Sequence, residues 1–329
     1  MWLFWLAIVG GLTLLVWSAD RFVIGAAAIA HNLGVSAIII GMVIMGFGTS
    51  APEMFVAGVA AFNGNPGVAV GNAVGSNIAN IALVLGISAL ASPLVVESKS
   101  LKREFPALVL VSLLVLVLIW DLELSRMDGF VLLGGTICLV AWMLWIAQKE
   151  RSFGDPLERE FESELPHDMS TRVATLWTLT GLVLLVVSAQ LLVWGAINIA
   201  QAFGVSDLLI GLTIIAIGTS LPEVAVSVTA SIKGEDDIAI GNIIGSNMFN
   251  LLAVLGVAGS IEAATFSNEV LFRDYATMLA LTVALFVMAY GFRGKGHINR
   301  FEASILLAAY IAYLGWLYIS EISQRIASG

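Results

Sequence analysis

A stretch that occurs twice decides the fold: residues 41–53 read GMVIMGFGTSAPE, and residues 211–223 read GLTIIAIGTSLPE. Each copy is followed by a second shared motif, GNAVGSNIAN at 71–80 and GNIIGSNMFN at 241–250. The offset is constant, because 211 − 41 and 241 − 71 both give 170. Such self-similarity at a fixed spacing indicates two copies of one structural unit.

Composition places the chain in a membrane. Hydrophobic residues make up 59% of the sequence and charged residues only 12%, far from the balance of a soluble domain. Most apolar runs are about 20 residues long, enough for a helix to cross a hydrocarbon layer of about 30 Å. Helices also satisfy their own backbone hydrogen bonds in lipid. We therefore predict an integral membrane protein surrounded by lipid, whose first apolar segment is retained because it lacks a basic start and an evident cleavage site.

The apolar runs predict an all-α fold with ten transmembrane helices. The expected spans are 2–30, 36–61, 68–91, 105–121, 127–147, 173–202, 207–232, 238–260, 275–291 and 301–319. Five helices per copy is an odd number, so the second copy starts from the opposite side of the membrane and is inverted. Many secondary transporters have this plan, with the substrate site near the midplane where the repeats meet.

The predicted units are a first five-helix repeat over 1–147, an acidic cytoplasmic linker over 148–172 and a second five-helix repeat over 173–329. The linker could be a regulatory cation sensor or a solvated tether. It lacks the D-x-[DN]-x-[DN]-G spacing of a calcium-binding loop, which favours the tether.

The basic residues predict the orientation. With the N-terminus outside, the inside loops hold eleven of the 15 Lys and Arg residues, and the outside segments hold only Arg126, Arg273 and Arg325. This asymmetry follows the positive-inside rule. We therefore expect a multi-pass protein of the inner (plasma) membrane with both termini outside.

Two carboxylates, Glu53 and Glu223, lie well inside apolar runs at equivalent places in the repeat. A charge there costs about 2.5–3.5 kcal/mol on insertion scales and by default marks a function. Inversion would bring both to the centre. Asp20–Arg21 is different, because Gln190 and Leu191 occupy the equivalent positions, and we interpret it as an ion pair rather than a ligand.

The surroundings of each Glu are rich in oxygen. Pro52 and Pro222 should kink their helices within the GTS segments and free backbone carbonyls, which are natural cation ligands in transporters. Thr49 and Ser50 lie four and three residues before Glu53, on the same helix face. The second copy repeats this arrangement with Thr219, Ser220 and Glu223.

The following span of each copy carries a polar stripe with a spacing of four residues. The stripes are Asn72, Ser76 and Asn80 in the first copy and Asn242, Ser246 and Asn250 in the second. Small and polar residues in membrane helices often only pack, but here they recur at identical spacing in both copies. All-oxygen coordination suits Ca²⁺ or Na⁺ rather than zinc or copper, and the three His residues fall in loops.

These four motifs resemble the two alpha repeats of the sodium/calcium exchanger family, within the calcium/cation antiporter superfamily. The resemblance covers nearly the whole chain and implies ion binding by a defined set of residues: Thr49, Ser50, Glu53, Ser76, Asn80, Thr219, Ser220, Glu223 and Ser246. It also implies carbonyl ligation from Gly46 and Ala216, and sliding of the long first and sixth helices as a gate. Some relatives carry Asp where this chain has Asn250, which bears on potassium dependence.

The predicted function is antiport of Ca²⁺ against Na⁺ by alternating access at a midplane site. A Ca²⁺/H⁺ antiporter is the alternative, since a buried Glu can also exchange a proton, and a cation channel is a third class, although channels usually assemble rings from several subunits. No nucleophile and base lie together in a span, so we do not expect an enzyme. We expect no cofactor and no nucleic-acid partner. The expected partners are Ca²⁺, Na⁺ or alternatively H⁺, and membrane lipid, and we expect the protein to be a monomer.

Overall fold

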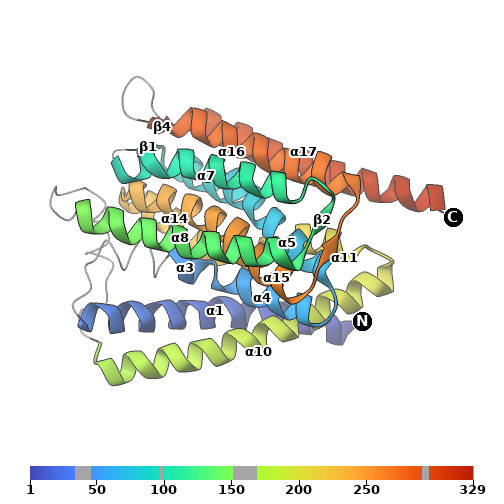
Figure 1. Cartoon of the computed structure of the whole chain (residues 1–329), viewed down its shortest axis with the longest axis horizontal. Coiled ribbons are helices and arrows are strands. Elements are labelled where there is room, and N and C mark those ends of the chain that lie inside the picture. The colour runs from blue at the N-terminus through green and yellow to red at the C-terminus, as the bar shows by residue number, and fades with distance from the viewer. Residues whose placement is uncertain (34–45, 97–98, 151–168, 291–295, 329) are drawn as a thin grey trace.

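The computed structural model describes residues 1–33, 46–96, 99–150, 169–290 and 296–328, and these are helical apart from two short strand pairs (Figure 1). The helical elements of the first half are α1 (Trp2–Asn32), α3 (Gly46–Thr49), α4 (Ala51–Phe62), α5 (Pro66–Ala79), η2 (Asn80–Val84), α6 (Leu85–Ala91), α7 (Lys99–Leu118) and α8 (Arg126–Glu150). Those of the second half are α10 (Thr171–Phe203), α11 (Asp207–Ile210), η3 (Gly211–Ile215), α12 (Ala216–Thr219), α13 (Leu221–Lys233), α14 (Asp236–Phe249), η4 (Asn250–Val254), α15 (Leu255–Ile261), η5 (Val270–Tyr275), α16 (Ala276–Ala289) and α17 (Arg300–Ser328), where η marks π-helical turns.

Several of these helices are long and apolar enough to cross a membrane. Within the described residues there are seven, namely Trp2–Asn32, Pro66–Ala91, Arg126–Trp145, Thr171–Ala200, Asp236–Ile261, Val270–Ala289 and Arg300–Ser320. A bent pair, Leu208–Thr219 and Leu221–Lys233, makes an eighth if it is one span. The prediction of a multi-pass helical membrane protein is thus confirmed. The count of ten spans stays a prediction, because residues 34–45 of the second expected span lie outside the described ranges.

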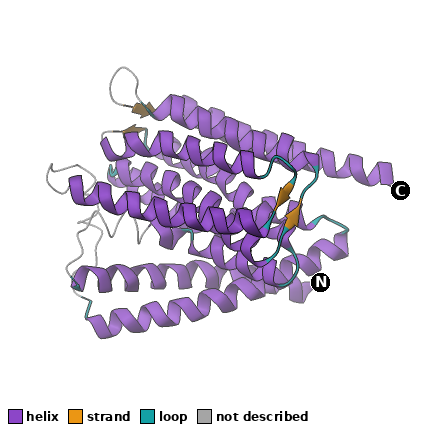
Figure 2. Cartoon of the chain, viewed as in Figure 1, coloured by secondary structure: helices purple, strands orange, loops and turns teal. Residues whose placement is uncertain are grey.

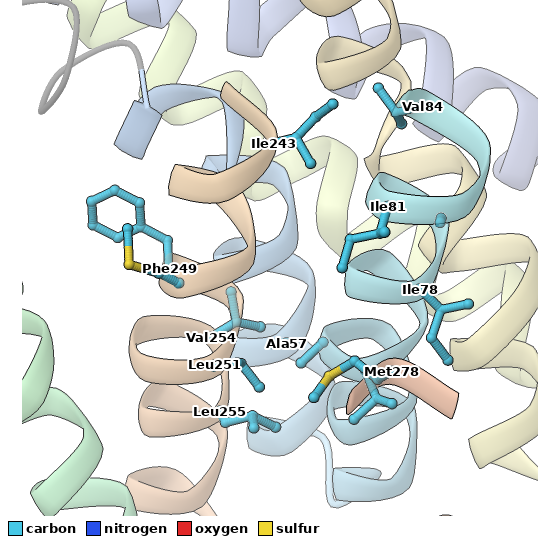
Figure 3. Packing of buried hydrophobic residues seen from close by; sticks show 14 of the residues in the cluster. Ala57, Ile78, Ile81, Val84, Ile243, Phe249, Leu251, Val254, Leu255 and Met278 are labelled. Carbon is cyan, nitrogen blue, oxygen red and sulfur yellow. The ribbon is translucent and has the colours of Figure 1, made fainter. Parts of the chain in front are cut away.

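The centre of the bundle is formed by two interrupted helices, α5–η2–α6 and α14–η4–α15. In the most apolar 18-residue stretches of Pro66–Ala91 and Asp236–Ile261, 83% and 89% of the residues are buried. In the peripheral helix Arg126–Trp145 the corresponding share is 22%. Figure 3 shows apolar side chains of both columns, such as Ile78 and Val254, around Ala57 of α4. Burial on all sides explains why these two helices can carry polar stripes that never meet lipid.

Helices α1 and α10 lie side by side along one edge of the bundle (Figure 1). Arg21 of α1 lies at the interface between the two helices. Its guanidinium is 5.8 Å from the ring centre of Trp17 and 5.3 Å from the ring centre of Trp177 in α10. Its Nε is 3.4 Å from Asp20 Oδ2. The predicted Asp20–Arg21 ion pair is therefore present, and the cation also contacts two aromatic rings.

Two antiparallel strand pairs, which the sequence did not predict, lie at opposite ends of the bundle (Figure 2). Strand β1 (Leu94–Val96) pairs with β4 (Gly296–Ile298), and β2 (Glu123–Leu124) pairs with β3 (Ala264–Thr265). Strands of two or three residues are too short for an alternating pattern to reveal. Each pair joins the first half of the chain to the second.

The predicted linker over 148–172 is described only at its edges. Helix α8 runs on to Glu150, and α10 begins at Thr171. Residues 151–168 lie outside the described ranges, so the division into 1–147, 148–172 and 173–329 stays a prediction.

Candidate functional site

Both GTS motifs are points where a helix is broken. Helix α3 ends at Thr49 and α4 begins at Ala51, with Ser50 between them at φ −84° and ψ 2°. In the second copy α12 ends at Thr219 and α13 begins at Leu221, and the axes on either side of the break differ by 43°. A proline occupies the first turn after each break. The predicted kinks are therefore confirmed.

Glu53 and Glu223 lie in the first turn after these breaks, and both are fully buried. Ser220 Oγ donates to Glu53 Oε1 at 3.5 Å, and Ser246 Oγ donates to Glu223 Oε1 at 3.1 Å. The second oxygen of each carboxyl group, Oε2, has no hydrogen-bond partner within the described part of the chain. The site thus presents two carboxylate oxygens whose lone pairs are open to a ligand.

The threonine hydroxyls join the two halves of the chain. Thr49 Oγ1 donates to Asn242 Oδ1 at 3.1 Å, and Thr219 Oγ1 donates to Asn72 Oδ1 at 3.0 Å. Each asparagine in turn donates its Nδ2 to the backbone carbonyl of the Glu in its own half, at 3.2 Å for Glu53 and 3.5 Å for Glu223. Two equivalent chains of hydrogen bonds therefore lie around the carboxylates.

The predicted serine and carbonyl positions lie in the same network. The hydroxyls of Thr49 and Ser246 are 3.1 Å apart, and those of Ser76 and Thr219 are 3.4 Å apart. The Ala216 carbonyl accepts the Ser220 N–H at 3.1 Å and the Thr219 hydroxyl at 3.4 Å. Thr49, Glu53, Ser76, Thr219, Ser220, Glu223, Ser246 and Ala216 are therefore brought together. Ser50 Oγ is buried without a hydrogen-bond partner among the described residues, and Gly46 is the first residue of α3.

Asn80 and Asn250 each begin a π-helical turn, η2 and η4, inside the central helices. Such turns widen the helix and often occur at functional sites. Asn80 Nδ2 donates to Asn247 Oδ1 at 3.2 Å, which leaves its Oδ1 without a hydrogen bond in the described structure. Both amide atoms of Asn250 are also buried without such partners there. The two amides predicted to face the site therefore have oxygens available to a ligand.

Asn77 and Asn247 also lie in this network, although the motif spacing did not predict them as site residues. Asn77 Nδ2 donates to the Asn247 carbonyl at 3.3 Å and lies 3.5 Å from Met278 Sδ. Both asparagines are buried. The signal was available, because they are the final residues of GSN in both copies, but they lie off the stripes of four-residue spacing. Asn247 accepts the hydrogen bond that orients the Asn80 amide, and the Asn77–Asn247 hydrogen bond joins the two halves of the chain.

Close approach of the two halves depends on glycine. A Cβ on Gly71 of α5 would lie 2.5 Å from the Leu208 carbonyl oxygen, and one on Gly211 would lie 2.6 Å from the Val68 carbonyl oxygen. Neither clash could be relieved by a side-chain movement, because both involve backbone atoms. Glycine therefore lets α5 and η3 bring the hydroxyls and amides of one half against the carboxylate of the other.

The types of ligand atom in the site indicate which cations it can bind. It consists of carboxylate, hydroxyl, amide and carbonyl oxygens, and the described residues contain no group of three or more His, Cys, Asp or Glu side chains that could hold a metal. Oxygen ligands suit hard cations such as Ca²⁺ and Na⁺. Two carboxylates balance one divalent ion or two monovalent ions.

A family model described as "Sodium/calcium exchanger protein" matches residues 3–145 and 173–319 of the chain. The two matched stretches begin 170 residues apart, 173 minus 3, which is the offset of the motifs. The chain belongs to the sodium/calcium exchanger family. This confirms the resemblance and places the protein among cation antiporters of the membrane rather than among enzymes.

Relatives of this exchanger span nearly its full length. A putative antiporter CaxA of Alkalimonas amylolytica is 51% identical over 94% of this chain and 97% of the relative. The sodium/calcium exchanger MaX1 of Methanosarcina acetivorans is 30% identical over 94% and 96%. A solved structure of the sodium-calcium exchanger NCX_Mj, soaked with 100 mM Na⁺ and 10 mM Sr²⁺, matches with a TM-score of 0.66 and 32% identity over 95% and 98%. The fold of the exchanger is therefore that of this family.

Proposed function

We propose that the protein exchanges Ca²⁺ for Na⁺ at one oxygen cage around Glu53 and Glu223. The observation that carries this proposal is that both carboxyl groups are fully buried and each keeps one oxygen without a hydrogen bond among the described residues. A buried carboxylate left uncompensated is costly, and a bound cation compensates it. Membership of the sodium/calcium exchanger family supports the choice of ions.

The ligands in this proposal are the predicted ones. Carboxylate oxygens come from Glu53 and Glu223, and the remaining oxygens come from the following groups: the side chains of Thr49, Ser50, Ser76, Asn80, Thr219, Ser220, Ser246 and Asn250, and the carbonyls of Gly46 and Ala216. The hydroxyls and amides can complete the shells of Na⁺ ions when Ca²⁺ leaves. The transported ions are the ligands of the site, and the proposal includes no resident cofactor.

We further propose that the two halves are inverted repeats of five helices and that the cage opens alternately to either side. The hydrogen bonds Thr49–Asn242 and Thr219–Asn72 support this, because they are the same bond with the halves exchanged. In that arrangement one half can rock against the other around a site that both share. The long pair α1 and α10 would move as the gate. We place the protein in the inner membrane with both termini outside, as a monomer.

Coupling to Na⁺ rather than to H⁺ is favoured by the hydroxyls. Proton exchange needs only the carboxylates, whereas Thr49, Ser76, Thr219 and Ser246 all direct hydroxyls into the network. Hydroxyl and carbonyl oxygens without charge suit monovalent ions that must bind and leave. Ca²⁺/H⁺ antiport is the alternative that the experiment must separate.

Uptake of ⁴⁵Ca²⁺ into proteoliposomes tests the proposal. Vesicles loaded with Na⁺, K⁺ or choline are diluted into buffer without that ion, with and without a pH gradient. We expect uptake only from Na⁺-loaded vesicles, and none in protein-free vesicles or with Glu53→Gln protein. Uptake driven by the pH gradient with choline inside would instead establish Ca²⁺/H⁺ antiport, and passive uptake without any gradient would indicate a channel.

A further inference from the structure

A cavity of about 660 Å³ lies outside the cation cage, between the α1/α10 pair and the helices α4 and α15. It is lined by Phe47 of α3, Met54 and Phe55 of α4, Leu182 and Val186 of α10, and Val257 of α15, among others. The cavity is partly open at the surface of the bundle, so molecules of the surrounding medium can occupy it.

The lining excludes water and ions as occupants. Among the described residues, none that lines the cavity is charged, and Gln190 is the one with a side-chain amide. Water needs two to four polar partners to be held, and apolar cavities stay dry. An apolar occupant gains dispersion contacts with all the walls.

The rim of the cavity is continuous with the lipid-facing surface. Phe62 at the end of α4 is 82% exposed and Val186 of α10 is 43% exposed, and both also line the cavity. In a membrane these surfaces contact hydrocarbon. The occupant can therefore enter sideways from the bilayer without crossing any polar layer.

At two positions that line the cavity, the equivalent residues of the other half differ in size or charge. Gly58 lines it, and the equivalent residue at the 170-residue offset is the larger Val228. Gln190 also lines it, and the equivalent residue there is the charged Asp20. Added volume and added charge would both disfavour hydrocarbon at these positions.

We propose that this cavity binds one acyl chain of a membrane phospholipid, which lies as a wedge between α10 and α4. The chain enters past Phe62 and Val186 and packs along Phe55 and Met54. The headgroup stays at the membrane surface near the end of α4. This site is separate from the cation cage and does not depend on which ions are exchanged.

A photoreactive lipid tests the proposal. The full chain is reconstituted with a phospholipid that carries a diazirine near the end of one acyl chain. On illumination the diazirine loses N₂, and the carbene inserts into a neighbouring C–H bond. Mass spectrometry of peptides should find adducts on 54–62 and 182–190, in addition to the general labelling of lipid-facing α8.

Gly58→Leu is the decisive variant, because it fills the cavity. A Cβ at Gly58 would meet Val257 Cγ1 at 3.4 Å and Ile261 Cδ1 at 4.0 Å, so the first added atom fits without a clash. We expect adducts on 54–62 and 182–190 to be lost while labelling of α8 persists. The matched control is Gly134→Leu, which adds the same side chain where a Cβ would have no atom within 4 Å. It should leave the cavity adducts unchanged.

A second variant guards against misfolding of Gly58→Leu. Gln190→Glu adds a charge with little change of volume, and the equivalent residue of the other half, Asp20, also carries a carboxylate. It should also remove the cavity adducts, because a carboxylate beside hydrocarbon is unfavourable. Equal cavity labelling in the wild type and in a folded variant of either kind, or no cavity adducts in the wild type, would overturn the proposal. Neither result depends on whether Ca²⁺ is transported.

Discussion

Thr219 Oγ1 donates a hydrogen bond of 3.0 Å to Asn72 Oδ1, and this bond joins the second half of the chain to the first beside Glu53. The same hydroxyl lies 3.4 Å from that of Ser76. Thr219 is fully buried, so water cannot replace a lost bond. One hydroxyl thus positions an amide, a second hydroxyl and the contact between halves.

Replacement of this hydroxyl should weaken ion binding as well as folding. Thr219→Val has nearly the same shape but leaves Asn72 Oδ1 without its donor, a loss of about 1–3 kcal/mol for a buried group. We expect roughly tenfold weaker Ca²⁺ binding, equivalent to about 1.4 kcal/mol. Calorimetric titration of the purified protein measures this. Thr219→Ser keeps the hydroxyl and should stay near the wild type; equal affinities for Val and Ser would show that the hydroxyl is not used.

The two buried carboxylates should each be indispensable. Glu53→Gln and Glu223→Gln keep the shape of the side chain but leave a single charge for a divalent ion. We expect each to abolish exchange in proteoliposomes while the protein remains inserted and monodisperse. The matched control is Glu123→Gln, at an exposed residue of strand β2, which should transport as the wild type does. Transport at the wild-type rate by either buried variant would remove that residue from the site.

The sequence predicted the parts of the site that both copies share. Glu53 and Glu223, and the Thr and Ser residues before them, occur in identical motifs at one offset, so identity itself marked them. The kinks followed from Pro52 and Pro222, because proline cannot donate to the preceding turn. The structure places each Glu directly after a helix break and bonds Glu53 to Ser220 and Glu223 to Ser246, whereas Ser50 Oγ has no hydrogen bond among the described residues.

The features that the sequence did not predict arise where the copies differ or where partners are distant. The cavity was not predicted, because helices from both halves of the chain line it and the spacing within either copy does not encode how they pack. The Asn77–Asn247 contact depends on how two helices are rotated, which no periodicity gives. The strand pairs join residues more than 100 positions apart and contain too few residues for a pattern.

Arg21 should hold α1 and α10 together. Its guanidinium lies within 6 Å of the ring centres of both Trp17 and Trp177, a cation–π arrangement worth about 0.5–1 kcal/mol at a partly exposed site. Lysine keeps the charge but loses the flat stacking surface. We expect Arg21→Lys to lower the Tm in detergent by roughly 1–2 °C. Arg126→Lys, at an exposed ion pair 3.6 Å from Glu262, should change it less; an equal loss would mean that stacking contributes nothing.

Orientation can be tested with reporter fusions. The distribution of Lys and Arg predicts that fusions after Asn63 and after Gly329 report the outside, and that a fusion near Gly154 reports the cytoplasm. Gly154 lies outside the described residues, so this prediction rests on sequence alone. An outside signal at Gly154 would contradict the inverted arrangement of the halves.

Exchange should not require K⁺, and Asn250 is the reason. It is fully buried at the start of η4, and its amide offers an oxygen without a charge. With two carboxylates in the cage, one Ca²⁺ already balances the charge, and a K⁺ bound beside it would leave an uncompensated positive charge in a medium of low dielectric constant. In proteoliposomes, the wild-type protein should therefore exchange ions at the same rate when choline replaces all K⁺ as when K⁺ is present. Asn250→Asp adds the missing charge and should make exchange respond to K⁺, while Asn250→Ser, which adds none, should not. A strict K⁺ requirement in the wild type would show that the cage holds more negative charge than Glu53 and Glu223 provide.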